Sequence, residues 1–253
     1  MRSNLALADV TSWYGDSVIR APSTLGKVEK GFLASRPPEI LCDWFQGTMP
    51  LSIRDSVLER LAATFGAPAL RADIPPEMRC YRECLEFPNG SRLYQSNRYK
   101  DTCCIVLSGA TNPSHHFPLI QQLVQAGVKA TRFDLAFDDR RGQVSIDDIC
   151  NHLHSRTMIS RWKKATANEE LNLSSGSCCG RKVQFGSKAS DAYLVTYDKG
   201  LETETADEGE WVRWELRLSG EQANQFVTEF LADHPDAADG DLRKHVAKAK
   251  NQS

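Results

Sequence analysis

Alternation of apolar and polar positions predicts most of the secondary structure in the middle of the chain. Side chains two residues apart share a face of a strand, whereas those three and four apart share a face of a helix. This rule predicts strands near residues 40–48, 78–87, 91–97, 102–108, 130–139, 181–186, 191–199 and 211–218. It predicts amphipathic helices near residues 52–65, 115–126, 145–155 and 220–232. The order strand, helix, several strands, helix therefore occurs twice.

Local signals support two of these helix starts. Ser52 with Asp55, and Ser145 with Asp148, have the three-residue spacing of a capping box. Gly66 follows the first apolar stripe and is expected to end that helix. These positions define the helix boundaries more closely than the hydrophobic pattern alone does.

The repeated order predicts an α+β fold with two similar halves of antiparallel sheet and helices packed on one face. The halves are expected at about 39–128 and 129–233, within one domain of residues 39–233. Residues 1–38 are rich in proline and glycine and show no sustained period, which predicts a flexible N-terminal arm. Residues 234–253 are expected to form a polar tail.

Composition restricts the protein class only a little. The chain has 253 residues, 41% of them hydrophobic, and a formal net charge of −2. That charge counts mildly against a nucleic-acid partner, although a local basic surface can still bind phosphates. No stretch approaches the roughly 20 apolar residues of a membrane span, so we expect a cytoplasmic protein without a membrane partner. The spacing of the eight cysteines does not match a zinc site.

Charged residues share one face of two strands whose other face is apolar. Asp134 and Asp138 project from the strand at 130–139 with only the small Ala136 between them. Glu215 lies on the second such strand, at 211–218. The simplest interpretation is a solvated sheet face with cross-strand ion pairs. The alternative is a site for Mg²⁺ or Mn²⁺, since these cations prefer carboxylate oxygens.

Three motifs in order carry a resemblance to a known family. They are T-R-F-D-L-A-F-D at 131–138, Y-D-K-G-L-E at 197–202 and R-W-E-L-R-L at 213–218. Together they resemble the replication initiation factor family, which includes initiators of rolling-circle plasmids and filamentous phages. The resemblance covers about residues 40–232. It implies a nicking enzyme, and it implies that the polar sheet face forms a DNA cleft.

The resemblance also implies roles for particular residues. The hydroxyl of Tyr197, beside Lys199, would attack a phosphodiester at the origin. The products would be a 5′-phosphotyrosyl link and a free 3′-OH. The metal ligands for Mg²⁺ or Mn²⁺ would be Asp134, Asp138 and Glu215. Apart from the resemblance, Arg132, Arg213 and Arg217 are expected to bind DNA phosphates, because guanidinium groups bind phosphate bidentately. Arg140 and Arg141 would extend this DNA-binding track, or they are solvated loop residues without a ligand. The expected partners are origin DNA in single-stranded or cruciform form, and the host helicase and polymerase.

Three alternatives stay open. Tyr193 shares the strand face of Tyr197 and competes with it as the nucleophile. The chain could bind the origin and regulate replication without acting as an enzyme. His152 and His154 form a His-x-His pair that in another class of nickases binds metal on a strand. Here they fall in a segment with helical spacing, where residues two apart point about 200° apart.

Overall fold

The computed structural model describes most of the predicted domain. The described residues are 39–98, 100–108, 116–140, 144–158, 162–171, 173–174, 178–203 and 211–233. The predicted arm at 1–38, the predicted tail at 234–253 and Arg141 lie outside them. Among the described residues, no helix is long and apolar enough to cross a membrane.

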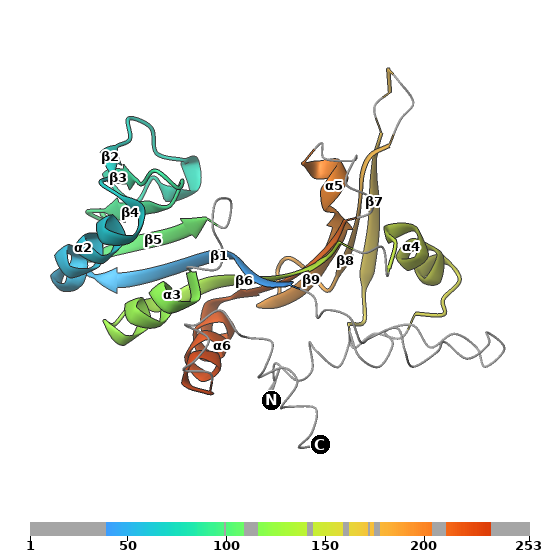
Figure 1. Ribbon diagram of the computed structural model, residues 1–253. Coiled ribbons are helices and arrows are strands. Elements are labelled where there is room, and N and C mark those ends of the chain that lie inside the picture. The colour runs from blue at the N-terminus through green and yellow to red at the C-terminus, as the bar shows by residue number, and fades with distance from the viewer. Residues whose placement is uncertain are drawn as a thin grey trace. The chain divides into compact units, whose positions relative to one another are not determined.

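The described strands and helices follow the predicted order closely (Figure 1). The strands are β1 (Glu39–Pro50), β2 (Ala69–Leu70), β3 (Glu83–Glu86), β4 (Arg92–Gln95), β5 (Thr102–Ser108), β6 (Lys129–Asp139), β7 (Ala165–Leu171), β8 (Cys178–Phe185), β9 (Ala192–Asp198) and β10 (Val212–Ser219). The helices are α2 (Arg54–Phe65), α3 (His116–Gln125), α4 (Ile146–His154), α5 (Lys199–Glu202) and α6 (Gly220–Asp233). Two short 3₁₀ helices, η1 (Leu51–Ile53) and η2 (Pro76–Met78), lie in the first half of the chain.

The strand order repeats between the two halves of the chain. The order is β2-β3-β4-β5-β1 for the first half, followed by β6-β10-β9-β8-β7 for the second. In each half the first strand of the sequence neighbours the last strand. The pairs β1–β5, β3–β4, β7–β8 and β8–β9 are antiparallel. The α+β antiparallel fold expected from the sequence is therefore confirmed.

The described residues group into two compact units that differ from the two halves of the chain. One unit contains residues 41–135 and 217–233, and the other contains residues 39–40 and 136–216. We call them the β1 unit and the β9 unit. Strands β1, β6 and β10 contribute residues to both, so each unit is described separately below.

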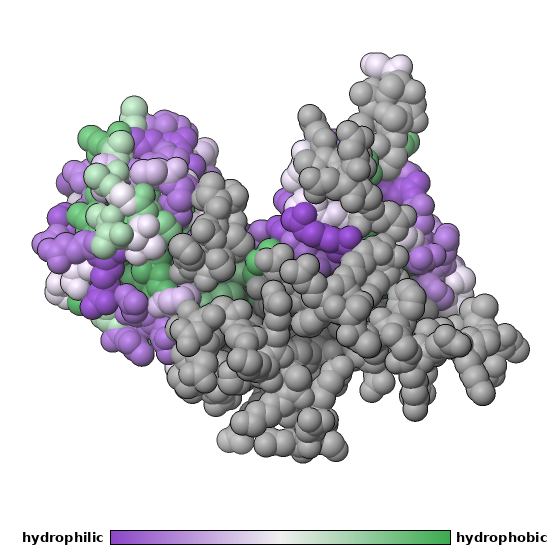
Figure 2. Space-filling view, in the orientation of Figure 1, coloured by the Kyte–Doolittle hydropathy of each residue, from purple (hydrophilic) through white to green (hydrophobic). Residues whose placement is uncertain are grey.

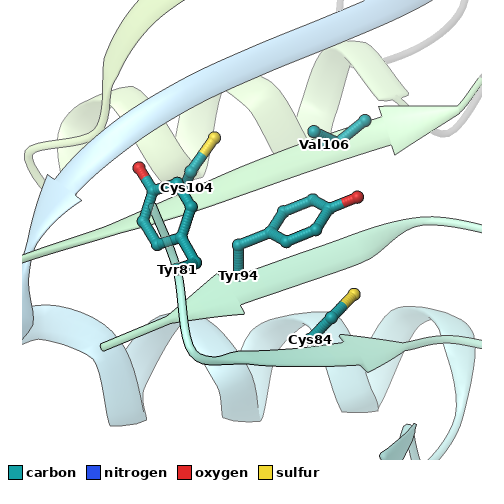
Figure 3. Packing of buried hydrophobic residues seen from close by; sticks show 5 residues of the cluster. All are labelled: Tyr81, Cys84, Tyr94, Cys104 and Val106. Carbon is teal, nitrogen blue, oxygen red and sulfur yellow. The ribbon is translucent and has the colours of Figure 1, made fainter. Parts of the chain in front are cut away.

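The core of the β1 unit is aromatic and aliphatic. A cross-strand row joins Cys84 on β3, Tyr94 on β4 and Cys104 on β5, and Tyr81 packs beside Tyr94 at a ring-centroid distance of 5.9 Å (Figure 3). Burial raises the pKa of both the Tyr81 hydroxyl and the Cys104 thiol to about 12. These groups are thus neutral at physiological pH and serve as packing residues.

Helices α3 and α6 pack on a second group of buried residues in the β1 unit, separate from the Tyr81–Tyr94 cluster. The ring of Phe133 on β6 contacts Phe117 of α3 and Phe226 of α6, at centroid distances of 6.4 and 5.7 Å. His116 of α3 is buried, meets Phe65 edge-on and lies 3.4 Å from the carbonyl oxygen of Cys42. Aromatic contacts of this kind fix helix orientation as well as burying area.

Three local features differ from the sequence prediction or refine it. Ser52 does not cap α2, because it lies within η1 and the N-cap position falls on Ile53. Ser145 does cap α4 and accepts the amide N–H of Asp148 at 3.0 Å. Strand β7 was not expected, because all seven of its residues are exposed and an edge strand needs no apolar alternation. The space-filling view shows a mainly hydrophilic surface over β7 and α4 (Figure 2).

Candidate active site around Tyr197

Tyr197 of β9 lies against a buried carboxylate in the β9 unit. Its hydroxyl donates a hydrogen bond to Oε1 of Glu215 on β10. Only 8% of Tyr197 and 1% of Glu215 are exposed to solvent. Burial raises the pKa of Tyr197 above its ordinary value, and the negative charge of Glu215 raises it further. The phenol is therefore protonated at neutral pH, and its proton already points at an acceptor.

Two lysines lie beside the ring of Tyr197. Lys182 of β8 is the direct cross-strand partner of Tyr197, and its Nζ lies 5.5 Å from the ring centroid. The Nζ of Lys199 lies 5.7 Å from the same centroid and forms an ion pair with Glu202. The sequence indicates Lys199 but not Lys182. Alternation of apolar and polar positions assigns a residue to a strand face, but it does not say which residue of the next strand lies beside it.

The sequence predicts Lys199 at the end of strand 191–199, and this prediction is wrong. Strand β9 ends at Asp198, whose side chain accepts the amide N–H of Leu201 at 2.9 Å and so caps α5. Lys199 is thus the first residue of a short helix. It still faces Tyr197, because the turn into α5 brings its side chain back over the ring.

A buried ion pair joins β6 and β10 within the same unit. Arg213 donates to both carboxylate oxygens of Asp138, at 2.6 and 2.8 Å. The two side chains are 8% and 1% exposed. This bidentate geometry is the strong form of a charge-assisted hydrogen bond. Asp138 is therefore neutralised by Arg213, and Arg213 is held two residues along β10 from Glu215.

A second group of charges lies in the β1 unit. Arg132 donates to Asp134 at 3.0 and 2.5 Å, and Arg217 approaches the same carboxylate at 3.6 Å. The guanidinium of Arg132 also lies 5.2 Å from the ring centroid of Trp44. Because Asp134 is 1% exposed, the interpretation of this strand as a solvated face is wrong, although its prediction of ion pairs is right.

The proposed metal ligands do not form a metal-binding group in this structure. Among the described residues, no three His, Cys, Asp or Glu side chains lie close enough together to hold a metal ion. Asp134, Asp138 and Glu215 are instead engaged by Arg132, Arg213 and Tyr197 respectively. The donor set described here thus does not fit a divalent cation, and the metal role stays a prediction from the family resemblance.

Comparison with known proteins places this region in a family. A model of the family described as "Replication initiation factor" matches residues 128–253, which include β6, β9 and β10. This part of the chain belongs to the replication initiation factor family. A Bacillus subtilis (strain 168) protein named "Putative DNA relaxase NicK" is 36% identical over 121 residues, which is 46% of this chain. The chain spans about a third of that relative's length, with 34% covered.

A solved structure shares the fold. It is the rolling circle replication initiator protein from Geobacillus stearothermophilus, and the match has a TM-score of 0.66 at 21% sequence identity. The match covers 81% of this chain and 80% of that one. At this identity the match shows the fold alone, and it agrees with the α+β architecture described above.

The competing nucleophile lies elsewhere on β9. The Cβ of Tyr193 lies beside Gly186, so close that a methyl group in place of the glycine hydrogen would come within 3.2 Å of it and within 2.8 Å of Trp162. Tyr197, by contrast, directly faces Glu215 and lies beside Lys182. The geometry therefore favours Tyr197 over Tyr193 as the candidate nucleophile.

The histidine pair lies on a helix, as the spacing predicted. His152 and His154 both belong to α4, and Nδ1 of His152 lies 2.8 Å from the hydroxyl of Thr157. Side chains two apart on a helix point in different directions. The two imidazoles of this pair therefore do not point toward a common ligand.

A cavity of about 470 Å³ lies beside α4 rather than beside Tyr197. It is lined by Asp147, Cys150, Asn151, His154, Ala167, Asn168, Glu169 and Arg181. Arg181 pairs with Asp147 of α4, whereas its neighbour Lys182 faces Tyr197. Because consecutive strand residues point to opposite faces, the cavity and the tyrosine site lie on opposite faces of β8.

Proposed function

We propose that this protein is a DNA strand-nicking replication initiator in which Tyr197 attacks a backbone phosphodiester. The observation that carries the proposal is the hydrogen bond from the Tyr197 hydroxyl to the buried carboxylate of Glu215, with two lysines beside the ring. The family match supports it, since one relative's name specifies a DNA relaxase and a solved structure's title specifies a rolling-circle initiator.

The chemistry follows from the protonation state of the phenol. A neutral phenol is a weak nucleophile, so an adjacent base must take its proton as the new bond forms. Glu215 is already in hydrogen-bonding contact with that proton. As the Tyr197 oxygen bonds to phosphorus, the proton passes to Glu215 and the bond from phosphorus to the 3′ oxygen breaks. The 3′ oxygen takes a proton from water, which leaves a 5′-phosphotyrosyl link and a free 3′-OH.

The cations around Tyr197 would stabilise this step electrostatically. Negative charge accumulates on the phosphoryl oxygens in the transition state, and fixed positive groups in a partly dehydrated site lower its energy. Lys182 and Lys199 are positioned for that role beside the ring. Because the described donor set does not fit a metal ion, no step here is assigned to Mg²⁺ or Mn²⁺. A host polymerase would extend the 3′-OH after a helicase unwinds the duplex.

The decisive experiment compares two tyrosine variants on the same strand. Wild type, Tyr197→Phe and Tyr193→Phe are incubated with a labelled oligonucleotide carrying the origin, with Mg²⁺, with Mn²⁺ or with EDTA. We expect wild type and Tyr193→Phe to give a nicked product and a covalent protein–DNA band on a denaturing gel. Tyr197→Phe is expected to give neither. Unchanged nicking by Tyr197→Phe would overturn the assignment of the nucleophile.

A third variant tests the proton acceptor. Glu215→Gln keeps the size of the side chain and can still accept a hydrogen bond, but it is a far weaker base. We expect the nicking rate to fall by about 10²–10⁴-fold, the usual contribution of general base catalysis. Loss of this size at unchanged DNA affinity would support the role of Glu215. An unchanged rate would remove Glu215 from the mechanism.

A second function, origin binding without nicking, is favoured by one observation. Tyr197 is only 8% exposed, so the hydroxyl is largely enclosed in the structure without DNA. A protein of this kind would bind the origin with a steep dependence on salt concentration. It would give no nicked product in either Mg²⁺ or Mn²⁺. Filter binding at several salt concentrations, run beside the nicking assay, separates the two functions.

A further inference from the structure

An arginine is stacked on a tryptophan close to the tyrosine site, and neither belongs to the catalytic contacts described above. The guanidinium carbon of Arg140, which follows β6, lies 3.6 Å from the ring centroid of Trp211, which precedes β10. Arg213 lies near the same indole at 5.6 Å. Trp211 is partly buried, and Arg140 lies exposed over its ring.

The stack lies close to Tyr197 along the polypeptide. The carbonyl oxygen of Trp211 accepts the backbone N–H of Lys199 at 2.7 Å. Lys199 is two residues beyond Tyr197 and begins α5. The hydrogen bond therefore ties the stack to the chain directly after the nucleophile. A single extended DNA strand that places one phosphate at Tyr197 would pass Arg140 within a few nucleotides.

The stack prepares Arg140 for an anionic ligand. A guanidinium held over an aromatic ring carries its N–H groups at the edge of its own plane, and that edge matches the oxygens of a phosphate. The contact with Trp211 also limits the conformations of a long side chain before any ligand arrives. Lysine in this position would carry the same charge but would lack the planar fork.

We propose that Arg140, held against Trp211, binds a backbone phosphate of single-stranded DNA next to the phosphodiester that Tyr197 attacks. The position of this subsite rests on the proposed function, since it is defined relative to the nicked linkage. The binding itself does not require nicking. Arg140 is then a substrate-binding residue, and Trp211 is a positioning residue that acts through it.

The test measures DNA affinity with one phosphate neutralised at a time. Single-stranded origin oligonucleotides, each with one methylphosphonate linkage, are titrated by fluorescence anisotropy. All proteins carry Tyr197→Phe, so that cleavage does not distort binding. We expect one linkage near the nick site at which the methylphosphonate weakens binding about tenfold or more, as for a lost charged hydrogen bond. Arg140→Ala should bind unmodified DNA about tenfold or more weakly than its parent. A methylphosphonate at this linkage should then not lower the affinity of Arg140→Ala any further.

Matched variants separate a phosphate contact from general charge or from misfolding. Arg140→Lys should recover part of the affinity and part of the selectivity for that linkage. Trp211→Phe should behave like the parent protein, and Trp211→Ala like Arg140→Ala. Arg181→Ala removes the same charge from the opposite face of β8, where Arg181 pairs with Glu169, and should leave the linkage profile unchanged.

Two outcomes distinguish this inference from the proposed function. If the methylphosphonate at each linkage lowers the DNA affinity of Arg140→Ala and of its parent by the same factor, the Arg140 subsite is wrong. This holds whether or not the unmutated protein nicks DNA. If the linkage effect disappears in Arg140→Ala but the unmutated protein does not nick, the subsite stands and the nicking function fails.

Discussion

Removing the carboxylate of Asp138 should destabilise the protein strongly. The side chain of Arg213 is 8% exposed in the wild-type structure. In the Asp138→Ala variant its guanidinium loses the two hydrogen bonds of 2.6 and 2.8 Å that it donates to Asp138. Breaking a buried pair by removing one partner costs about 3–5 kcal/mol, because the remaining buried charge loses its counter-ion. For a folded region of this size, each kcal/mol lowers Tm by about 2–4 °C. We therefore expect Tm to fall by about 6–20 °C.

Thermal unfolding followed by far-ultraviolet circular dichroism in EDTA measures this effect. The matched control is Glu169→Ala, which breaks the ion pair between Arg181 and Glu169, whose side chains are 34% and 44% exposed. Exposed pairs contribute about 0–1 kcal/mol, so the control should change Tm by no more than a few degrees. The double variant Asp138→Ala with Arg213→Met removes both charges and should be less destabilised than Asp138→Ala alone.

The opposite sign would refute this reasoning. If Asp138 were mainly a ligand in an acidic metal site, its removal would relieve repulsion between carboxylates in EDTA. Tm of Asp138→Ala would then equal or exceed that of wild type in EDTA. The variant would be less stable than wild type only in the presence of the metal, because it would lose the increase in Tm that metal binding confers. A fall in Tm that is independent of metal is the result expected from the ion pair.

Three further predictions concern stability and ionisation. Ser145→Ala should cost about 1 kcal/mol through loss of the α4 cap, whereas Ser52→Ala, at a position that does not cap α2, should leave Tm nearly unchanged. The pKa of Tyr197 is raised, so its contribution to stability is present below about pH 10, the unfolded value, and is lost as the pH rises above it. The phenolate absorbance of the folded protein up to about pH 11 should accordingly be the same in wild type and Tyr197→Phe. If the variant lacks an increase in phenolate absorbance that wild type shows near pH 10, the prediction is wrong. Gly47→Ala should cost about 1–3 kcal/mol in urea unfolding, because its Cβ would lie 2.5 Å from a valine methyl group. Gly180→Ala should not lower the stability in this way, because a Cβ at this position would have no atom within 4 Å.

The sequence predicted the strands and helices that bury an apolar face. Strands β6 and β10 alternate Phe133, Leu135 and Phe137, or Leu216 and Leu218, with charged residues, and burial requires that pattern. Elements without such a requirement were missed. Strand β7 is exposed along its whole length, and α5 has four residues, which is too short for a helical period.

The sequence could not predict which charges meet. Asp138 and Arg213 are 75 residues apart, and Tyr197 and Glu215 are 18 residues apart on different strands. A period assigns each side chain to a face, but its neighbours depend on strand order and register. The family resemblance named Asp138 and Glu215 without saying what they contact. The structure pairs one with an arginine and the other with the phenol of Tyr197.

These pairings suit Asp138 and Glu215 of the β9 unit to different roles in the proposed mechanism. Arg213 engages both oxygens of Asp138 in a buried charge-assisted pair, which is a structural contact. Glu215 accepts a hydrogen bond from the Tyr197 hydroxyl, which is the contact that a general base for this phenol needs. In that mechanism, a phosphate arriving beside Lys182 and Lys199 would need only to reach the Tyr197 oxygen, because the hydrogen bond already directs the phenol proton at Glu215.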